Sequence, residues 1–253
     1  MFSVEHLNRL RLAELEVVHR YLPPRGRILE VGAGTGRQGL ALRRLGYDVS
    51  MIEIESSNYS SDRLCEITNY NGRDIPFGDA EFDVVFSSNV LEHVPELDYL
   101  HAEIRRVLKH DGYAIHVVPT HFWRLWSSLT VMPAALQHLF AIRRELLPRA
   151  HLSRGEKNRL AGVWRAALRL CAGALFQRRH GERGNVLTEL WFFHPSWWRR
   201  NFVANGYSIK HEEPVELFYT GSMFMSDKLP MAWRKGLARM LGSACEIFVV
   251  APK

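Results

Sequence analysis

The sequence Ile-Leu-Glu-Val-Gly-Ala-Gly-Thr-Gly occupies residues 28–36, and it decides the fold. A short apolar segment, predicted to be a strand over residues 27–31, leads into three glycines at alternate positions. Residues 37–45 then have the pattern of a helix. Glycine lets the backbone approach a ligand closely because it lacks a Cβ atom, and the following helix points its free amide groups into the turn. The stretch is therefore typical of a nucleotide-cofactor turn in an α/β sheet.

Strands and helices are predicted to alternate along the rest of the chain. Further strands are expected at 48–54, 67–70, 82–87, 113–118, 207–213 and 246–251, and helices at 4–21, 96–108, 194–205 and 231–240. The helix at 96–108 is expected to be stopped by Asp111-Gly112. This alternation favours a Rossmann-like, doubly wound α/β fold with a seven-stranded, mainly parallel sheet. Ligands bind such sheets beyond the carboxyl ends of the strands.

Length and composition indicate one domain over residues 1–253. The chain is 47% hydrophobic and 24% charged, as is usual for globular proteins. Its three cysteines are widely separated, so we expect no metal site and a cytoplasmic location. Charged residues near the N-terminus argue against a signal peptide. No run of ~18 apolar residues is present, and we therefore expect no transmembrane helix.

Residues 120–188 depart from the alternating pattern and are predicted to form a helical insertion within the domain, acting as a substrate lid. Residues 125–140 form a run of 16 without a formal charge, in which Pro133 is expected to interrupt the helix. A second helix is predicted at 158–176, with Trp164, Leu168, Cys171 and Leu175 on one face.

The positive charge of the chain is concentrated in and after this insertion. Residues 143–200 contain 13 Lys and Arg against 4 Asp and Glu, a net charge of +9, so the remainder of the +6 chain carries −3. Two interpretations remain open. The insertion is either a pair of cap helices packed on the sheet, or a lid that contacts a membrane surface or a lipid-bearing substrate through residues 120–180. The charge also suggests an anionic partner.

A dinucleotide site is the first alternative for the glycine-rich turn. Gly34-Thr-Gly36-Arg-Gln-Gly39 fits the pattern G-x-G-x-x-G, and Glu53 ends the next strand, where an acid would hold a ribose. Three features argue against it. Glu30 lies inside the strand before the turn, the glycines begin one step earlier, and a full helix precedes the strand.

Five motifs in continuous order resemble those of the class I S-adenosylmethionine-dependent methyltransferases. They are Glu-Val-Gly-Ala-Gly-Thr-Gly at 30–36, Glu53, Ile-Pro-Phe at 75–77, Phe-Asp-Val-Val-Phe-Ser-Ser-Asn-Val-Leu-Glu-His-Val at 82–94, and Leu-Lys-His-Asp-Gly-Tyr at 108–113. The resemblance covers roughly residues 25–120. It implies a methyltransferase of the type 11-like kind, with S-adenosylmethionine as the cofactor.

The resemblance also implies which residues hold the cofactor. Gly32, Gly34 and Gly36 would line its methionine and ribose parts, with Glu30 near the amino-acid end. Glu53 would accept hydrogen bonds from both ribose hydroxyls, since a carboxylate has two acceptor oxygens. The adenine contact stays open between Asn71 and Asp74, because the family's aspartate is replaced here by Asn71. The full set of expected cofactor-binding residues is Glu30, Gly32, Ala33, Gly34, Gly36, Glu53, Ile54, Asn71, Gly72, Asp74, Ser88, Asn89 and His93.

Catalysis is expected to depend on placement of the acceptor, with a histidine as general base if the acceptor is a hydroxyl. His93, His121 and His194 are the candidates because each lies near a strand end or the insertion. Ser88-Asn89-Val90-Leu91 stands where amino-group methyltransferases carry an Asn-Pro-Pro-Tyr-type motif, which favours an oxygen acceptor. We expect a phosphate- or lipid-bearing glycan or lipid as the substrate. The alternatives are a small-molecule methyltransferase, a nucleic-acid methyltransferase (although no nucleic-acid partner is expected) or a non-catalytic cofactor-binding protein.

Overall fold

Seven strands form a single sheet in the order β3-β2-β1-β4-β5-β7-β6. The computed structural model describes residues 4–146, 162, 165, 177, 179–221 and 228–253. Strand β7 is antiparallel to β5 and to β6, while the pairs among β1 to β5 are parallel. The predicted seven-stranded, mainly parallel sheet is therefore confirmed. The strands are β1 (Arg27–Val31), β2 (Asp48–Ile54), β3 (Thr68–Tyr70), β4 (Phe82–Ser88), β5 (Leu108–Pro119), β6 (Tyr207–Pro214) and β7 (Cys245–Pro252).

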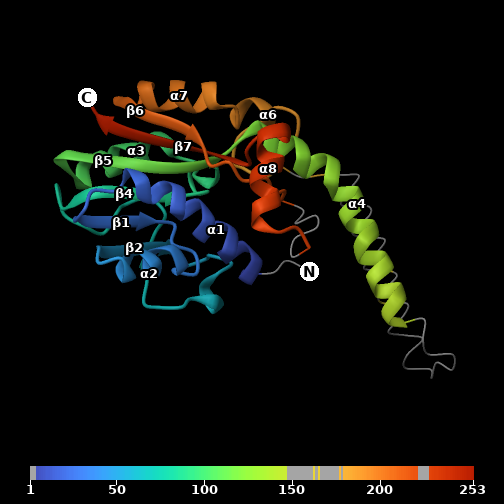
Figure 1. Cartoon of the computed structure of the whole chain (residues 1–253). Helices are drawn as coiled ribbons and strands as arrows, with labels where there is room; N and C mark the ends of the chain where they lie inside the picture. Colours follow the sequence, from blue (N-terminus) through green and yellow to red (C-terminus); the bar gives the residue numbers. More distant parts are fainter. Residues whose placement is uncertain (1–3, 147–161, 163–164, 166–176, 178, 222–227) are drawn as a thin grey trace.

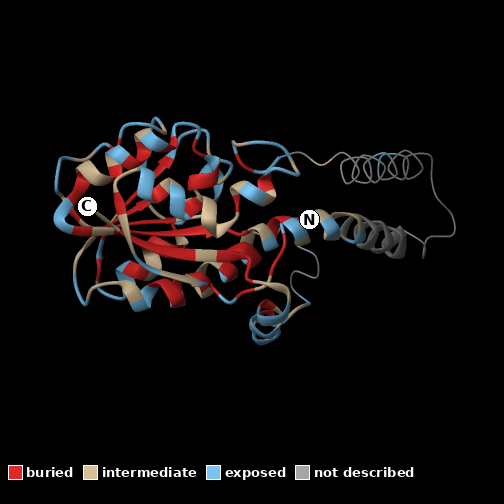
Figure 2. Ribbon diagram, turned by 90° about the horizontal axis from the view of Figure 1, so that it is seen from above, coloured by how far each residue is buried: buried red, intermediate tan, exposed pale blue. Residues whose placement is uncertain are grey.

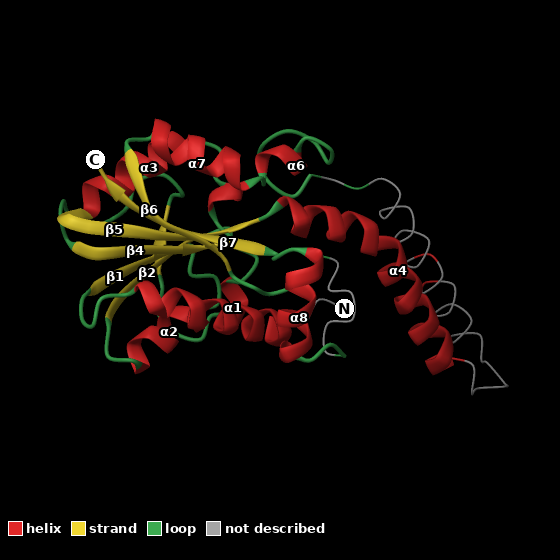
Figure 3. Cartoon of the chain, turned by 45° about the horizontal axis from the view of Figure 1, so that its top comes forward, coloured by secondary structure: helices red, strands yellow, loops and turns green. Residues whose placement is uncertain are grey.

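Helices cover both faces of the sheet. Figure 3 shows α3 and α7 on one face and α1 and α2 on the other, which is the three-layer arrangement of a doubly wound fold. The α-helices are α1 (Val4–Val18), α2 (Arg37–Arg44), α3 (Leu97–Val107), α4 (His121–Leu146), α6 (Glu189–Phe192), α7 (Pro195–Ala204) and α8 (Met231–Leu241). Three short 3-10 helices are η1 (His19–Tyr21), η2 (Ser60–Asp62) and η3 (Leu91–His93). The sequence pattern did not predict α6.

Alternate residues of each central strand enter two separate apolar cores. In β4, Val84 and Phe86 belong to the core beneath α1 and α2, whereas Val85 belongs to the core beneath α3 and α7. This follows from the two-residue period of a strand. Both faces are therefore apolar, as a buried parallel sheet requires, and Figure 2 shows the strands as the buried centre of the molecule.

Helix α2 packs unusually close to the sheet at Gly39. A Cβ atom on Gly39 would lie 2.3 Å from the Met51 sulfur and 2.5 Å from a carboxylate oxygen of Glu30. Both neighbours are buried, with Met51 on β2 and Glu30 on β1. The last glycine of the G-x-G-x-x-G pattern is therefore explained by close packing of α2 on the two strands that carry the glycine-rich turn.

The prediction that Asp111-Gly112 stops a helix is wrong. Helix α3 ends at Val107, and both residues lie inside β5. Leu108 pairs with Phe82 and Tyr113 pairs with Val84, so residues 109–112 form a bulge between two pairing registers. The polar residues of this segment are tolerated because the bulge is exposed at the amino end of the strand.

Helix α4 begins directly after β5 and projects from the body of the domain (Figure 1). Contrary to the sequence-based expectation, it is not interrupted at Pro133, which lies inside the continuous helix. A proline removes one backbone hydrogen bond, and here that loss does not end the helix. The helix predicted at 158–176, including Trp164, Leu168, Cys171 and Leu175, lies almost entirely outside the described residues. Among the described helices, none is long and apolar enough to cross a bilayer.

Substitution of Gly39 by alanine should destabilise the protein, because the added methyl group has to displace buried atoms of Met51 or Glu30. We expect a loss of ~1–3 kcal/mol in the free energy of unfolding, the usual cost of overpacking. The matched control is Gly236→Ala in α8, where a Cβ atom would meet nothing within 4 Å. That change should stabilise the protein by ~0.4–1 kcal/mol. Urea unfolding of the three proteins measures both effects, and equal stabilities of Gly39→Ala and the parent would contradict the packing argument.

Candidate functional site

A cavity of about 1210 Å³ lies beyond the carboxyl ends of β1, β2 and β4. Its lining includes residues 32–35 of the β1–α2 turn, 53–59 after β2, and 88–90 after β4. Strand β1 pairs with β2 on one side and with β4 on the other. The chain therefore reverses its winding direction at this point, and such a switch point is where open α/β sheets bind ligands.

The Glu53 carboxylate is held in a defined orientation at the end of β2. One oxygen accepts a hydrogen bond from the Gly34 amide at 2.7 Å, and the other accepts one from the Ile54 amide at 2.9 Å. Glu53 is otherwise buried, yet it contributes to the lining of the cavity. Each carboxylate oxygen can accept a second hydrogen bond, so the pair is placed to accept two neighbouring hydroxyl groups of a ligand.

Backbone conformation brings the β1 turn and the β4 turn together. Gly32 has φ +72°, and a Cβ atom there would lie 2.4 Å from a methyl group of Val90, so no other residue fits. Asn89 also has a positive φ, 55°, and its amide donates to the carbonyl of Val117 at 2.8 Å. The thiol of Cys245 donates to the Asn89 side chain at 3.3 Å. The two turns thus form neighbouring walls of the cavity.

The N-terminal helix supplies residues that were not predicted to belong to the site. Leu7, Asn8 and Arg11 of α1 line the cavity. Arg11 donates to both oxygens of the buried Glu14 at 2.9 and 2.8 Å, and Ser88 donates to Glu14 at 3.2 Å. A guanidinium group has five N–H donors, so Arg11 retains donors for an anionic ligand group. The helical spacing of Leu7 and Arg11, four residues apart, is a sequence signal that could have revealed this face.

Asn71 and Asp74, between which the adenine contact was left open, differ in position. Asn71 lines the cavity and Asp74 does not. The side-chain oxygen of Asn71 accepts hydrogen bonds from the amides of Arg73 and Asp74, at 2.9 and 2.8 Å. The Asp74 carboxylate instead accepts from the Tyr99 hydroxyl at 2.6 Å, which lowers the pKa of Asp74. Asp74 therefore shapes this turn from outside the cavity.

Most of the other predicted cofactor-binding residues line the cavity. They are Gly32, Ala33, Gly34, Glu53, Ile54, Gly72, Ser88, Asn89 and His93. Glu30 and Gly36 are not part of the lining. Gly36 precedes α2 against Cys65, and Glu30 is buried beneath α2. Burial raises the pKa of Glu30 to about 8, so that its side chain is largely protonated at neutral pH.

The three candidate histidines do not form one site. His93 lies in η3 and lines the cavity, with its side chain 43% exposed. His121 and His194 pair with each other at a ring distance of 4.5 Å, and neither lines the cavity. The Nδ1 atom of His194 accepts a hydrogen bond from the Ser196 amide at 3.1 Å and thereby caps α7. The role of His194 in the described structure is therefore that of a helix cap.

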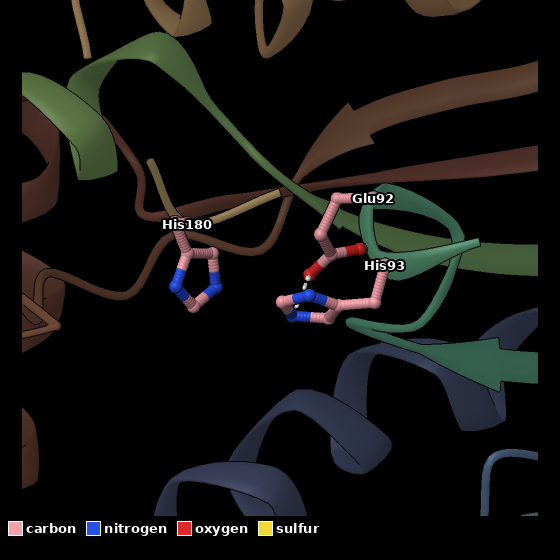
Figure 4. A group of neighbouring side chains, drawn as sticks. All are labelled: Glu92, His93 and His180. Atoms are coloured by element: carbon pink, nitrogen blue, oxygen red, sulfur yellow. Dashed lines mark ion pairs between the residues drawn. The ribbon is translucent and has the colours of Figure 1, made fainter. Parts of the chain in front are cut away.

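A fourth histidine, His180, was not predicted and lines the cavity opposite His93, at a ring distance of 4.7 Å. Figure 4 shows His93, His180 and the carboxylate of Glu92 converging. Although His180 is open to the cavity, desolvation in this concave surface and the neighbouring His93 lower its pKa to about 3. No strand end or motif precedes His180 in the sequence. Only the tertiary fold brings it here.

Comparison with known proteins agrees with this geometry. Residues 29–116 match the family model described as a methyltransferase domain. This part of the chain is a class I S-adenosylmethionine-dependent methyltransferase domain. The resemblance predicted from the five motifs is thus confirmed, and the dinucleotide alternative is set aside.

Two curated relatives resemble the methyltransferase domain in sequence. An uncharacterized protein of Methanocaldococcus jannaschii is 35% identical over 104 residues, which are 41% of this chain and 49% of that protein. The 24-methylenesterol C-methyltransferase 2 of Arabidopsis thaliana is 31% identical over 116 residues, 41% of this chain and 32% of that protein. The matched part of the chain therefore spans 49% and 32% of these relatives' lengths.

A solved structure matches nearly the whole fold. An S-adenosylmethionine-dependent methyltransferase from Mesorhizobium loti has a TM-score of 0.52 over 95% of this chain and 98% of that chain. The two sequences are 16% identical, so this likeness concerns the fold.

The cavity of the methyltransferase domain fits S-adenosylmethionine, the cofactor of this family. The paired oxygens of Glu53 suit the two ribose hydroxyls, because the amides of Gly34 and Ile54 orient them and leave each oxygen one acceptor position. The close approach of Gly32 to Val90 leaves the backbone itself as the surface beside the ligand. Arg11 lies in the same lining and offers a cation for the carboxylate of an amino-acid moiety.

Substitution of Glu53 by alanine should abolish or strongly weaken cofactor binding, because it removes both acceptors for the ribose hydroxyls. Hydrogen bonds to a charged group contribute ~1.5–3 kcal/mol each, so we expect affinity to fall about tenfold or more. Calorimetric titration with S-adenosylmethionine provides the measurement. Glu66→Ala, which removes an exposed carboxylate outside the cavity lining, is the control and should bind like the parent. Unchanged affinity in Glu53→Ala would refute the ribose assignment.

Proposed function

We propose that the chain transfers the methyl group of S-adenosylmethionine to an oxygen of a phosphate- or lipid-bearing acceptor, such as a glycan or lipid intermediate of the cell envelope. The observation that carries this proposal is a contact between α4 and the cavity. Trp123 of α4 lies 4.5 Å from the ring of His180, which lines the cavity. Helix α4, which contains the uncharged stretch, therefore begins beside His180 in the wall of the cavity.

The exposed side chains in the first turns of α4 support the proposal of an apolar partner. Phe122 and Leu125 are each 38% exposed and Leu129 is 57% exposed, so the helix presents apolar side chains to the surroundings within a few turns of the cavity. The net charge of +9 over residues 143–200 follows this helix directly in the sequence. Apolar and aromatic side chains next to basic ones are the combination that binds anionic lipid surfaces.

Methyl transfer requires mainly that the protein position the cofactor and the acceptor. Bound S-adenosylmethionine supplies an electrophilic methyl group on a positively charged sulfur. Glu53 and the glycine-rich turn hold the cofactor, while Ser88 and Asn89 border the place where the resemblance puts the methyl group. Bringing an acceptor to near-attack distance contributes up to ~7–11 kcal/mol. An acceptor hydroxyl must also lose its proton. Of the three predicted histidines, His93 alone lines the cavity, so we assign it to the acceptor side.

A carbon acceptor is the second candidate. The relative from Arabidopsis thaliana is named as a sterol C-methyltransferase, and its similarity covers the methyltransferase domain. An acceptor of that kind would also be apolar, and would therefore suit the same side of the cavity.

The class of acceptor is tested by incubating the protein with isotope-labelled S-adenosylmethionine and three separate substrate pools: an organic-solvent lipid extract, a water-soluble metabolite extract and total nucleic acid. We expect the label to enter the lipid extract. Cleavage of the labelled product with hydriodic acid, which releases a methyl group from oxygen but not from carbon, then distinguishes the two kinds of acceptor. Labelling confined to phosphate-free compounds of the water-soluble pool would establish a small-molecule methyltransferase, and labelling of nucleic acid would establish the third alternative. Either result would overturn the proposal.

The membrane contact is tested by co-sedimentation with vesicles made of equal parts phosphatidylcholine and phosphatidylglycerol. We expect binding at low salt that weakens as salt rises, because the basic segment contributes through screened charge. Leu129→Ser should bind about tenfold less well, since burial of a leucine side chain contributes ~1.5–3 kcal/mol. Leu45→Ser is the matched control, because Leu45 is equally exposed at 57% but follows α2. Absence of binding at low salt would exclude the contact.

A further inference from the structure

Three side chains that can bind metal ions meet at the cavity wall. Glu92 and His93 come from η3, which follows β4, and His180 comes from the segment that precedes α6. One ligand atom from each lies within 4.8 Å of the other two, and the Nε2 atom of His93 is 3.7 Å from a carboxylate oxygen of Glu92 (Figure 4). Both histidines line the cavity, so an ion bound between them would face the ligand.

The Glu92 carboxylate makes no hydrogen bond within the described part of the chain. Its side chain is fully buried, and neither oxygen has a hydrogen-bond partner among the described residues. A buried carboxylate without a donor is costly, and such a group usually has a cation or a catalytic task that explains it.

Hydrogen bonds hold His180 beside Glu92, although the two are far apart in sequence. The amide of Glu182 donates to the carbonyl of Glu92 at 2.8 Å. The buried carboxylate of Glu189 accepts from the amides of His180 and Gly181 and pairs with Arg124 at 2.8 Å. Gly181 leaves no room for a side chain, because a Cβ atom there would lie 2.8 Å from the Glu92 carbonyl oxygen. The backbone on both sides of the cluster is therefore fixed before any ion binds.

We propose that Glu92, His93 and His180 bind a divalent first-row transition-metal ion that accepts imidazole ligands, such as Zn²⁺, in the wall of the cavity. Two imidazoles and one carboxylate are a common ligand set for such ions, and they leave coordination positions open. Mg²⁺ and Ca²⁺ prefer oxygen ligands throughout and suit this set poorly. Metal–ligand bonds of ~2.0–2.2 Å require the three ligand atoms to move slightly closer together. Rotation of the exposed His93 ring provides part of this movement.

An ion in this position would act on the acceptor. Its open positions would face the cavity near Ser88 and Asn89, where an acceptor hydroxyl or phosphate oxygen could bind. A bound hydroxyl loses its proton to solvent more readily. Its oxygen then forms the bond to the methyl carbon, while the carbon–sulfur bond breaks and its electron pair stays on sulfur. The alternative is that Glu92 and His93 handle protons without a metal.

Metal binding separates these two possibilities without any assay of methyl transfer. Protein treated with a chelator and dialysed is titrated calorimetrically with Zn²⁺, and Co²⁺ is added to a second sample because its visible spectrum reports nitrogen ligation. We expect one high-affinity ion per chain and no comparable binding of Mg²⁺. Glu92→Gln and His180→Ala should each weaken Zn²⁺ binding at least about tenfold, as loss of a ligand requires.

Two further variants control this experiment. His110→Ala removes an exposed histidine that lies 3.0 Å from Asp111, and it should bind Zn²⁺ like the parent. His93→Ala removes a half-exposed ligand without disturbing the core, so it remains informative if the variant of the buried Glu92 folds poorly; it too should weaken binding. Calorimetry with S-adenosylmethionine checks that each variant keeps its cofactor site. Absence of Zn²⁺ binding in the parent, or equal binding in His93→Ala and the parent, would overturn the proposal and leave Glu92 and His93 as a proton-handling pair.

Discussion

The hydrogen bond from the Gly34 amide to the Glu53 carboxylate joins the carboxyl ends of β1 and β2, and the cavity depends on it. It orients a buried charge toward the ligand and fixes the glycine-rich turn at the same time. Two close approaches frame the same turn: α2 packs closely on the sheet at Gly39, and Gly32 lies against Val90 of the β4 turn. One backbone arrangement thus sets three walls of the cofactor site, with little contribution from flexible side chains.

The opposite side of the cavity is formed by residues from segments that are far apart in the sequence. There the sheet supplies only Glu92 and His93, and the facing residue, His180, comes from a segment far away in sequence. The carboxylate of Glu189 and the carbonyl of Glu92 hold that segment in place. Trp123 also contacts His180, so the start of α4, the return of the chain and η3 meet at one place.

Regular elements with strong local signals were predicted closely. Strands β1 and β2 have the predicted bounds. In each, an apolar run marks the strand, and a glycine after β1 or an acidic residue near the end of β2 marks its carboxyl end. The errors occurred where local signals compete with tertiary contacts. Asp111-Gly112 has the pattern of a helix stop, but strand pairing on both sides of the bulge incorporates it into β5. Pro133 has the pattern of a helix break, yet one missing hydrogen bond does not end a helix that continues on both sides.

By itself, the sequence determined the fold class and the cofactor, and ten of the thirteen residues that it predicted to bind the cofactor line the cavity. Those residues follow strand ends in chain order, and parallel strands bring their carboxyl ends to one edge. Tertiary structure separated the three candidate bases. The sequence offered His93, His121 and His194 together, with only His93 also in the expected cofactor-binding set, and the fold makes His194 a helix cap and pairs it with His121. It also brings His180 to the buried Glu92. The physical reason is that these contacts join residues far apart in the sequence, which no local pattern brings together.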